Sequence, residues 1–299
     1  MSAHIRIVSA NTAMVKGAER VAWRTGLAGK EAVMIAARRC RCGDTRRELP
    51  SAKAVVIGDL ATMAGMRQVA EAANAVGRYD AVIHNAGVGY REPRLETGDG
   101  LEHVFAVNVL APYLLTALIE PPARLVYLSS GMHRGGTASL ADPQWERRPW
   151  NGAQAYSDSK LFDVALAFAV ARRWPAVRSN ALEPGWVPTR MGGPAAPDDL
   201  SLAPVTQAWL AVGDEPAATV TGGYFYHQRP REVAPAVRDA AFQDELLGYC
   251  AALTGTTLPE FAGSAGLAGP AGLAGPAGAA AGWSMRSRSW CRPATPSLG

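Results

Sequence analysis

The chain alternates short apolar runs rich in β-branched residues with segments of helical periodicity, and this alternation limits the folds that it can form. Strands buried on both faces show little polar alternation, whereas a half-exposed strand has a polar residue at every second position. When each such strand is followed by a helix, the expected architecture is a parallel sheet covered on both faces. The predicted strands are residues 5–10, 32–37, 54–57, 79–83, 124–129, 178–182 and 223–226. The main predicted helices are residues 62–76, 101–118 and 156–173.

The sequence therefore predicts an α/β fold with a doubly wound parallel sheet of the Rossmann type. In such a sheet, ligands bind beyond the carboxyl ends of the strands. A chain of 299 residues can bury one large core, and we expect a single domain over residues 1–258.

The composition changes near the C-terminal end. From Gly263 to Gly278 glycine recurs at every third position, and AGLAGP occurs twice in tandem. So few triplets do not favour a collagen triple helix. We expect residues 259–299 to form a disordered low-complexity tail that has no part in the chemistry.

Composition and charge exclude several classes of protein. The formal net charge is only +4, and no basic stripe interleaved with aromatic residues is present, so nucleic acid is not expected as a partner. The four cysteines include one Cys40-Arg41-Cys42 pair without a second pair, which predicts no metal site and no disulfide framework. No apolar run approaches the ~18 residues of a membrane span, and no signal segment is visible. A cytoplasmic location is the expectation.

The strongest chemical signal is the segment Tyr156-Ser157-Asp158-Ser159-Lys160 in a predicted helix. Residues four apart lie on one helical face, so Lys160 is expected beside Tyr156. A neighbouring ammonium favours the phenolate and lowers the pKa of a tyrosine from its usual value of ~10. Such a tyrosine can exchange a proton with an alcohol or a carbonyl compound near neutral pH.

Other polar or turn residues fall where this cleft is expected. LVYLSSG ends a predicted strand at Ser129 and Ser130, and HNAG ends another at residues 84–87. Asn108 lies inside a predicted helix, where asparagine is a poor helix former. Pro184-Gly185 directly follows a further strand. Because the carboxyl ends of parallel strands share one edge of the sheet, these residues are expected at one site.

At this point the chain resembles the short-chain dehydrogenase/reductase family, and its C-terminal region resembles the retinol-dehydrogenase-like branch. The matching segments are HNAG, Asn108, YLSSG, YSDSK and EPGWVPT, in the family's order. The resemblance implies that Tyr156 is the general acid/base, Lys160 lowers its pKa and bonds a nicotinamide ribose, and Ser130 binds the substrate oxygen. It also implies that Asn108 supports a proton-relay water, which completes the catalytic set Asn108, Ser130, Tyr156 and Lys160.

The resemblance further implies a nicotinamide cofactor and the residues around it. Tyr156 and Lys160 would contact it, Asp59 and Leu60 would lie near its adenine, and one loop after each of two strands would line the rest. These lining residues are Asn85, Ala86 and Gly87, and then Pro184, Gly185, Val187 and Thr189.

The segment TAMVKGAE at residues 12–19 departs from the family's glycine-rich phosphate turn. In the preferred register Thr12-Ala13 takes the Thr-Gly position, Gly17 is the middle glycine, and Glu19 replaces the last. In the other register Ser9, Ala13 and Val15 replace all three glycines. Glutamate is unfavourable beside a pyrophosphate, because a helix N-terminus there should attract an anion.

Arg38 follows the second predicted strand, where an acidic residue would instead hold the ribose of NAD. Arginine there suits the 2′-phosphate of NADP, so NADP(H) is predicted over NAD(H).

Two functions remain open at this stage. The first is an NADP(H)-dependent oxidoreductase that acts on a small or medium lipophilic alcohol, ketone or aldehyde. The second is a non-catalytic or weakly active binding or regulatory protein on the same fold, because the phosphate-binding glycines are missing. The resemblance also suggests a homo-oligomer formed through helices 101–118 and 156–173, and we expect the loop between Ser130 and Tyr156 to form a wall of the substrate pocket.

Overall fold

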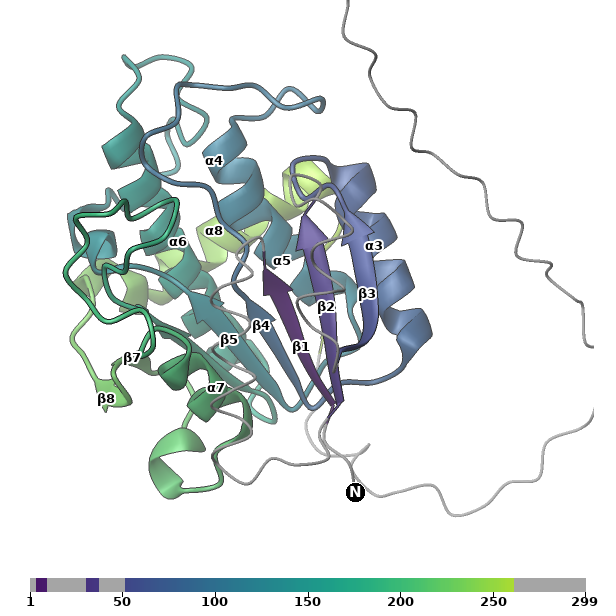
Figure 1. Ribbon diagram of the computed structural model, residues 1–299. Coiled ribbons are helices and arrows are strands. Elements are labelled where there is room, and N and C mark those ends of the chain that lie inside the picture. Colours follow the sequence, from purple (N-terminus) through teal and green to yellow (C-terminus); the bar gives the residue numbers. More distant parts are fainter. Residues whose placement is uncertain (1–3, 10–30, 38–51, 261–299) are drawn as a thin grey trace, which may run out of the picture. The chain divides into compact units, whose positions relative to one another are not determined.

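The computed structural model describes residues 4–9, 31–37 and 52–260, which form an eight-stranded sheet (Figure 1). The strand order is β3-β2-β1-β4-β5-β6-β7-β8. Every neighbouring pair is parallel except β7 and β8, which are antiparallel. The strands are β1 (His4–Ser9), β2 (Glu31–Ala37), β3 (Ala52–Gly58), β4 (Ala81–His84), β5 (Arg124–Leu128), β6 (Arg178–Leu182), β7 (Tyr224–Tyr226) and β8 (Arg229–Pro230).

This sheet confirms the predicted doubly wound α/β fold. From β1 the chain proceeds outward to β2 and β3, and it then returns to place β4 on the other side of β1. The strand order therefore reverses between β1 and β4, and the carboxyl ends of these two strands flank the position where Rossmann-type sheets bind ligands. The sequence pattern identified seven of the strands and missed β8, which has only two residues.

Side chains on the central strands alternate between two cores, because successive residues of a strand point to opposite faces. Val82, Leu125 and Tyr127 belong to the larger core, whereas Ile83 and Val126 belong to the smaller one. Both faces are buried, which is why these strands read as continuous apolar runs.

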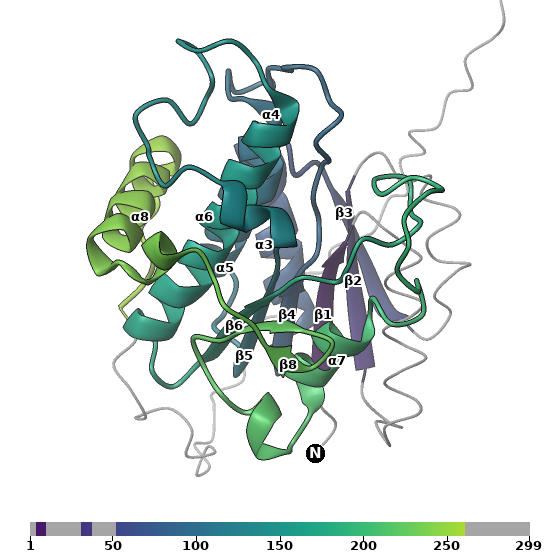
Figure 2. The same cartoon turned by 90° about the vertical axis from the view of Figure 1, so that its left-hand side faces the viewer.

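The described helices are divided unequally between the two faces (Figures 1 and 2). Helices α3, α5, α6 and α8 contribute to the larger core, and α7 contributes to the smaller one. Their bounds are α3 (Met63–Val76), α4 (His103–Phe105), α5 (Ala111–Leu118), α6 (Gly152–Arg173), α7 (Val205–Val212) and α8 (Ala240–Thr254). A π-helical turn (Ala106–Leu110) connects α4 to α5, so the helix predicted at 101–118 is one irregular element.

Helix α6 is buried on all sides from Ala155 to Val170. Helix α8 provides much of this cover: the rings of Phe162 and Phe242 pack 6.0 Å apart, and Arg172 and Arg173 bind Asp244 at 2.5 and 2.7 Å. The segment after α8 is also attached, since the Trp174 indole donates a hydrogen bond to the Pro259 carbonyl at 2.9 Å. Of the two helices expected to mediate self-association, α6 is therefore covered by α8 of the same chain. Self-association itself stays a prediction.

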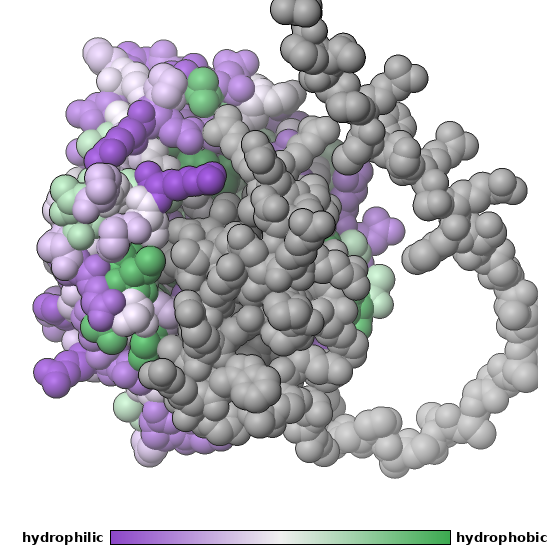
Figure 3. All heavy atoms as spheres, viewed as in Figure 1, coloured by the Kyte–Doolittle hydropathy of each residue, from purple (hydrophilic) through white to green (hydrophobic). Residues whose placement is uncertain are grey.

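The exposed part of the described surface is mixed in polarity. On the face shown in Figure 3, hydrophobic residues lie in small separate groups among hydrophilic ones. Within the described residues, the large hydrophobic side chains that are exposed are Leu95, Met132, Trp186, Leu202 and Val220.

The turn from β3 into α3 brings two backbone segments into close contact. Thr62 caps α3 by accepting a hydrogen bond from the Gly65 amide at 3.2 Å. A Cβ atom at Gly65 would lie only 2.1 Å from the Asp59 carbonyl oxygen. Because that oxygen belongs to the backbone, the turn that carries Asp59 and Leu60 must move if position 65 bears a side chain.

We therefore expect Gly65→Ala to lower the free energy of unfolding by about 1–3 kcal/mol, the usual cost of overpacking. The matched control is Gly248→Ala on the exposed side of α8, where a Cβ meets no atom within 4 Å. Alanine is the better helix former, so this control should raise stability by up to ~1 kcal/mol. Urea unfolding of both variants measures the difference, and equal effects would contradict the close contact at Gly65.

Candidate active site

The predicted catalytic residues meet at the carboxyl end of β5. Ser130 follows β5, Tyr156 and Lys160 lie in the first half of α6, and Asn108 lies in the π-helical turn before α5. The side chain of Asn151 caps α6 by accepting a hydrogen bond from the Gln154 amide at 3.1 Å, so the helix begins four residues before the predicted start. The Ser130 side chain lies close enough to the Tyr156 phenol to lower its pKa. The structure thus brings the predicted Ser–Tyr pair together.

Lys160 lies beside Tyr156, as expected for residues four apart on a helix. Its ammonium nitrogen is 5.7 Å from the centre of the Tyr156 ring. Nζ donates one hydrogen bond to the Leu128 carbonyl at 2.9 Å and another to Oδ2 of Asp163 at 2.7 Å. Leu128 is the last residue of β5, so Lys160 links the helix to the strand end that carries Ser130.

The pKa of Tyr156 is set by opposing effects. Burial raises the pKa of the Tyr156 phenol, whereas the Lys160 ammonium and the neighbouring Ser130 side chain lower it, and the net pKa lies above the usual 10.0. The spacing of Tyr156 and Lys160 correctly predicted that the lysine lowers the pKa of the tyrosine. It did not predict the burial of the phenol, which raises this pKa and is the larger effect. In the protein without ligand, the Tyr156 hydroxyl is therefore protonated at neutral pH.

Asn108 holds the loop after β4 against α6. Its amide nitrogen donates to the Val88 carbonyl at 3.1 Å and to the Ser159 hydroxyl at 3.0 Å, and its amide oxygen accepts from the Val88 amide at 2.8 Å. These contacts explain why an asparagine occupies a helical position. They also coincide with the π-helical turn, an irregularity that is frequent at functional sites.

The residues after β4 lie next to this set. A Cβ atom at Gly87 would be 3.3 Å from Oδ1 of Asn108 and 3.7 Å from Nζ of Lys160. Ala86 is buried. Gly87 therefore borders Asn108 and Lys160 in the loop after β4, where the strand order reverses. The cofactor-binding role of Asn85, Ala86 and Gly87 stays a prediction.

The two residues predicted near an adenine differ from each other. The Asp59 carboxylate accepts a hydrogen bond from the Ala61 amide at 3.1 Å and is partly exposed. The Leu60 side chain, in contrast, is only 2% exposed and belongs to the larger hydrophobic core. Only the backbone of Leu60 could contact a ligand, so its side chain is a packing residue.

The segment after β6 forms an ordered turn. Gly185 adopts φ of +92°, a conformation that favours glycine, and the Trp186 amide donates to the Asp198 carboxylate at 2.6 Å. Thr189 accepts a hydrogen bond from the Gly192 amide at 3.2 Å. Val187 is buried in the smaller core, so Pro184, Gly185 and Thr189 are the members of this predicted set with some exposure.

Three predicted cofactor residues, Thr12, Gly17 and Arg38, lie outside the described residues, as do the predicted phosphate turn and the predicted C-terminal tail after residue 260.

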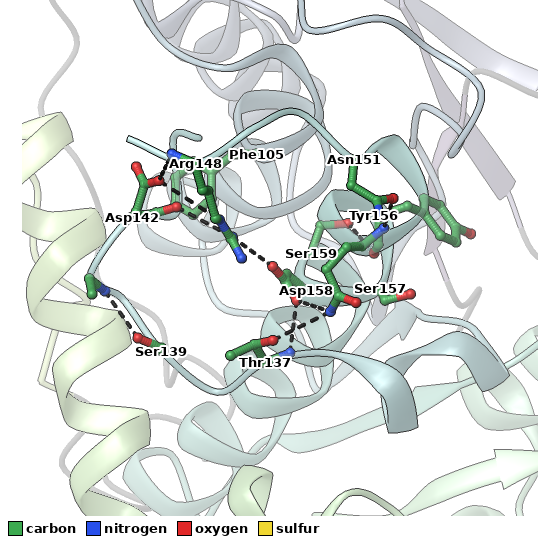
Figure 4. Close-up of polar contacts among 12 residues, drawn as sticks. Phe105, Thr137, Ser139, Asp142, Arg148, Asn151, Tyr156, Ser157, Asp158 and Ser159 are labelled. Atoms are coloured by element: carbon green, nitrogen blue, oxygen red, sulfur yellow. Dashed lines mark hydrogen bonds and ion pairs between the residues drawn. The ribbon is translucent and has the colours of Figure 1, made fainter. Parts of the chain in front are cut away.

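The loop before α6 is attached to the helix by a buried carboxylate (Figure 4). Asp158 accepts hydrogen bonds from the Thr137 amide at 2.7 Å, from Nη2 of Arg148 at 2.9 Å and from Nε2 of Gln154 at 2.8 Å. Arg148 lies between Asp158 and Asp142, and Tyr156 points away from this network.

The same loop is joined to the segment after β4. Trp150 donates from its indole nitrogen to the Glu92 carbonyl at 3.1 Å, and Arg94 donates to the Gln144 carbonyl at 3.2 Å. The ring of Tyr90, in that segment, packs edge-on to the Tyr156 ring with centroids 5.9 Å apart. Two loops that are far apart in sequence therefore meet on the Tyr156 side of the sheet.

Sequence reasoning missed Tyr90 and Asp163, which lie beside Tyr156 and Lys160, and Asp158, which anchors the loop before α6. Asp163 was visible as a charge within the apolar run LFDVALAFAVA, and its position three residues after Lys160 could have indicated a pair on one helical face. Asp158 stands within the YSDSK motif, but nothing local indicates its partners. Tyr90 has no sequence signal.

The fold and the arrangement of these side chains define a Rossmann-type protein with a Ser–Tyr–Lys site. The family described as enoyl-(acyl carrier protein) reductase matches residues 22–214. An uncharacterised oxidoreductase of Emericella nidulans is 38% identical over 236 residues, covering 77% of this chain and 90% of the relative. Human retinol dehydrogenase 13 is 33% identical over 230 residues, covering 67% of this chain and 68% of that protein. The chain therefore belongs to the short-chain dehydrogenase/reductase family of oxidoreductases.

Solved structures agree on the fold. A protein from Mycobacterium Paratuberculosis superimposes with a TM-score of 0.70 at 25% identity, covering 86% of this chain and 95% of that one. A short-chain dehydrogenase/reductase from Burkholderia multivorans with bound NADP has a TM-score of 0.57 at 18% identity, covering 78% and 99% of the two chains.

Two other features are absent from the described residues. Among them, no group of three His, Cys, Asp or Glu side chains is arranged to hold a metal ion. No helix in this part of the chain has both the length and the apolar character needed to cross a membrane.

We expect Asp158→Ala to loosen the loop at residues 136–151, because a backbone amide, an amide side chain and a guanidinium lose their buried acceptor. The expected loss of stability is about 1–3 kcal/mol, with faster hydrogen exchange confined to this loop. Glu146→Ala, which removes an exposed acid from the same loop, is the control and should change stability by less than ~0.5 kcal/mol. Unchanged exchange in Asp158→Ala would contradict the anchoring role.

Proposed function

We propose that the protein is an NADP(H)-dependent oxidoreductase that interconverts an alcohol and a carbonyl compound, with Tyr156 as the general acid/base. The observation that carries this proposal is the Tyr156 hydroxyl, which lies beside the Ser130 side chain and is flanked by the Lys160 ammonium in a buried site. A phenol that can hold a proton and a neighbouring ammonium that stabilises its ionised form are the two groups that proton transfer at a substrate oxygen uses.

Ser130 and Tyr156 act together on the substrate oxygen. Ser130 and Tyr156 present two neighbouring hydroxyl groups that can both bind the same oxygen. In carbonyl reduction Tyr156 donates its proton to that oxygen as negative charge develops, and Lys160 stabilises the phenolate that remains. In alcohol oxidation the same tyrosine, once ionised, accepts the hydroxyl proton. The raised pKa of Tyr156 in the ligand-free protein favours the protonated form, which is the form that reduction uses.

The residues around this pair fit a nicotinamide dinucleotide. The backbone of Gly87 lies close to both Asn108 and Lys160, and a side chain there would press against the Asn108 amide. Asn85, Ala86 and Gly87 would line the cofactor on one side, and Pro184, Gly185 and Thr189 would pass it on the other. When bound, the nicotinamide ring supplies or accepts the hydride. The protein's own contribution is to position the substrate and to hold the proton on Tyr156.

The choice of NADP(H) depends on Arg38. In the sequence this residue follows β2, where a cation can pair with a 2′-phosphate. The NADP bound to the Burkholderia multivorans protein is in keeping with this preference.

The substrate class follows from the wall of the site. The ring of Tyr90 packs against Tyr156. The exposed side chains of Met132 and Trp186 come two residues after Ser130 and one residue after Gly185, respectively. These aromatic and apolar groups favour a lipophilic ketone, aldehyde or alcohol. A cytoplasmic location remains part of the proposal.

We expect Tyr156→Phe to lower turnover by about 10²–10⁴-fold, because the phenyl ring keeps the packing but cannot transfer a proton. Cofactor affinity should change little. Tyr113→Phe is the control, since the Tyr113 hydroxyl donates to the Thr256 carbonyl at 2.7 Å, away from Ser130, and this variant should retain turnover. Initial rates on a panel of lipophilic carbonyl compounds measure both, and full activity of Tyr156→Phe would rule out the assigned role.

Titration with NADPH and separately with NADH, followed by tryptophan fluorescence, tests the cofactor. We expect saturable binding of both with tighter binding of NADPH, and Arg38→Ala should reduce that preference by roughly tenfold, the value of one lost charge contact. Equal affinities that Arg38→Ala does not change would contradict the NADP(H) assignment. Absence of binding to either nucleotide would favour the alternative that the chain is a non-catalytic relative with a lost phosphate turn.

A further inference from the structure

We propose that Asp163 is a positioning residue of this site, whose buried carboxylate holds Lys160 and offsets the positive charge that Lys160 presents to Tyr156. The inference rests on the proposed function only for its effect on turnover, because the pairing itself is a property of the protein without ligand.

The geometry places both charges inside the protein. Nζ of Lys160 and Oδ2 of Asp163 are 2.7 Å apart, and the two side chains are 6% and 3% exposed. Both residues lie in the stretch of α6 that is buried on every side. The second carboxylate oxygen of Asp163, Oδ1, is buried and has no hydrogen-bond partner among the described residues. Lys160 is therefore the group that compensates this carboxylate.

Stability alone does not account for the pair. Buried ion pairs gain little net free energy, because desolvation of both ions offsets their attraction, and apolar replacements are often as stable. The neighbours of Asp163 in the helix, Phe162 and Val164, are apolar and belong to the larger core. A carboxylate at this position is explained by the lysine that it faces, and that lysine also faces Tyr156.

The electrostatic consequence has a definite sign. Lys160 favours the ionised form of Tyr156, and a negative charge next to Lys160 weakens that effect. Asp163 itself acts on Tyr156 in the same direction, since it raises the pKa of the phenol. Burial raises the pKa of Asp163 to about 6 against the effect of Lys160, so the carboxylate is largely ionised at neutral pH. Asp163 therefore keeps the Tyr156 proton in place.

Other titratable or polar groups lie near Tyr156, Lys160 and Asp163, and the test variants leave them unchanged. Ser130 lies beside the Tyr156 phenol, and the phenols of Tyr90, Tyr127 and Tyr224 interact electrostatically with Tyr156 or Asp163. Lys160 is the positive charge among them. A neutral residue at position 163 leaves this charge uncompensated while the surrounding phenols stay unchanged.

The test compares wild type with Asp163→Asn in the full-length chain. Asparagine has the same shape, and its oxygen can still accept the hydrogen bond from Lys160. We expect the pKa of Tyr156 to fall by about one unit, the size expected for loss of a nearby like charge. The ascending limb of the pH profile of kcat/KM for alcohol oxidation, where the rate rises as Tyr156 loses its proton, should move to lower pH by the same amount. At a fixed pH on that limb, this shift corresponds to about tenfold more rate.

A second readout needs no turnover. The ultraviolet difference titration of tyrosinate in wild type minus Tyr156→Phe isolates the Tyr156 signal, and the same subtraction in the Asp163→Asn background measures its shift. Asp163→Ser serves as a second neutral variant if Asp163→Asn does not fold. Asp158→Asn is the matched control, because it removes another buried charge from α6 on the side that points away from Tyr156, and it should leave the titration unmoved.

The outcomes separate this inference from the proposed function. A shifted titration without turnover by any variant would support the role of Asp163 and contradict the oxidoreductase proposal. Turnover with an unshifted titration and an unshifted pH limb would overturn the role of Asp163 and leave the oxidoreductase proposal standing. An equal shift in Asp158→Asn would also overturn it, because the effect would then come from a general loss of charge.

Discussion

The burial of α6 is the constraint on which the rest of the site depends. This helix carries five polar or charged residues in a stretch where every residue is buried, and these are Ser157, Asp158, Ser159, Lys160 and Asp163. A buried polar group without a partner costs about 1–3 kcal/mol, so each of these side chains must find one within the protein. The partners come from the elements around the helix. The Ser129 hydroxyl donates to the Lys160 carbonyl at 2.7 Å, Leu128 accepts from the lysine ammonium, and Asn108 reaches Ser159.

This requirement also ties the elements of the site to one helix. The strand end that carries Ser130, the turn that carries Asn108 and the loop after β4 are all bonded directly or indirectly to α6. The loop before α6 is attached through Asp158 on another side of the same helix. The groups proposed for proton transfer are thus fixed by hydrogen bonds that also satisfy the buried helix, which is the support that an active site needs for accurate positioning.

Electrostatics and burial act against each other at Tyr156. A lysine four residues away favours the phenolate, but the same burial that strengthens this attraction also penalises any charged form. The balance leaves the phenol protonated in the ligand-free protein. Family membership defines the chemistry as that of short-chain dehydrogenases/reductases, whereas this balance, with Asp163 as a contributor, belongs to the residues of this chain.

Local sequence patterns were sufficient for the architecture and for the central residues of the site. Continuous apolar strands predicted a parallel sheet because both of its faces are covered, and the spacing from Tyr156 to Lys160 predicted their contact because a helix repeats every 3.6 residues. The contact between Asn108 and Val88 and the burial of Leu60 could not be read in this way, since both depend on which distant segment packs against the residue.

What the sequence by itself determined was the set of chemical groups and the edge of the sheet at which they meet. The tertiary structure alone decided how those groups are charged and what else they contact. The direction of the Tyr156 pKa, the burial of the Lys160–Asp163 pair and the cover of α6 by α8 all result from desolvation and from contacts between segments far apart in the chain. Neither effect has a local sequence pattern, because both depend on what surrounds a side chain after the chain has folded.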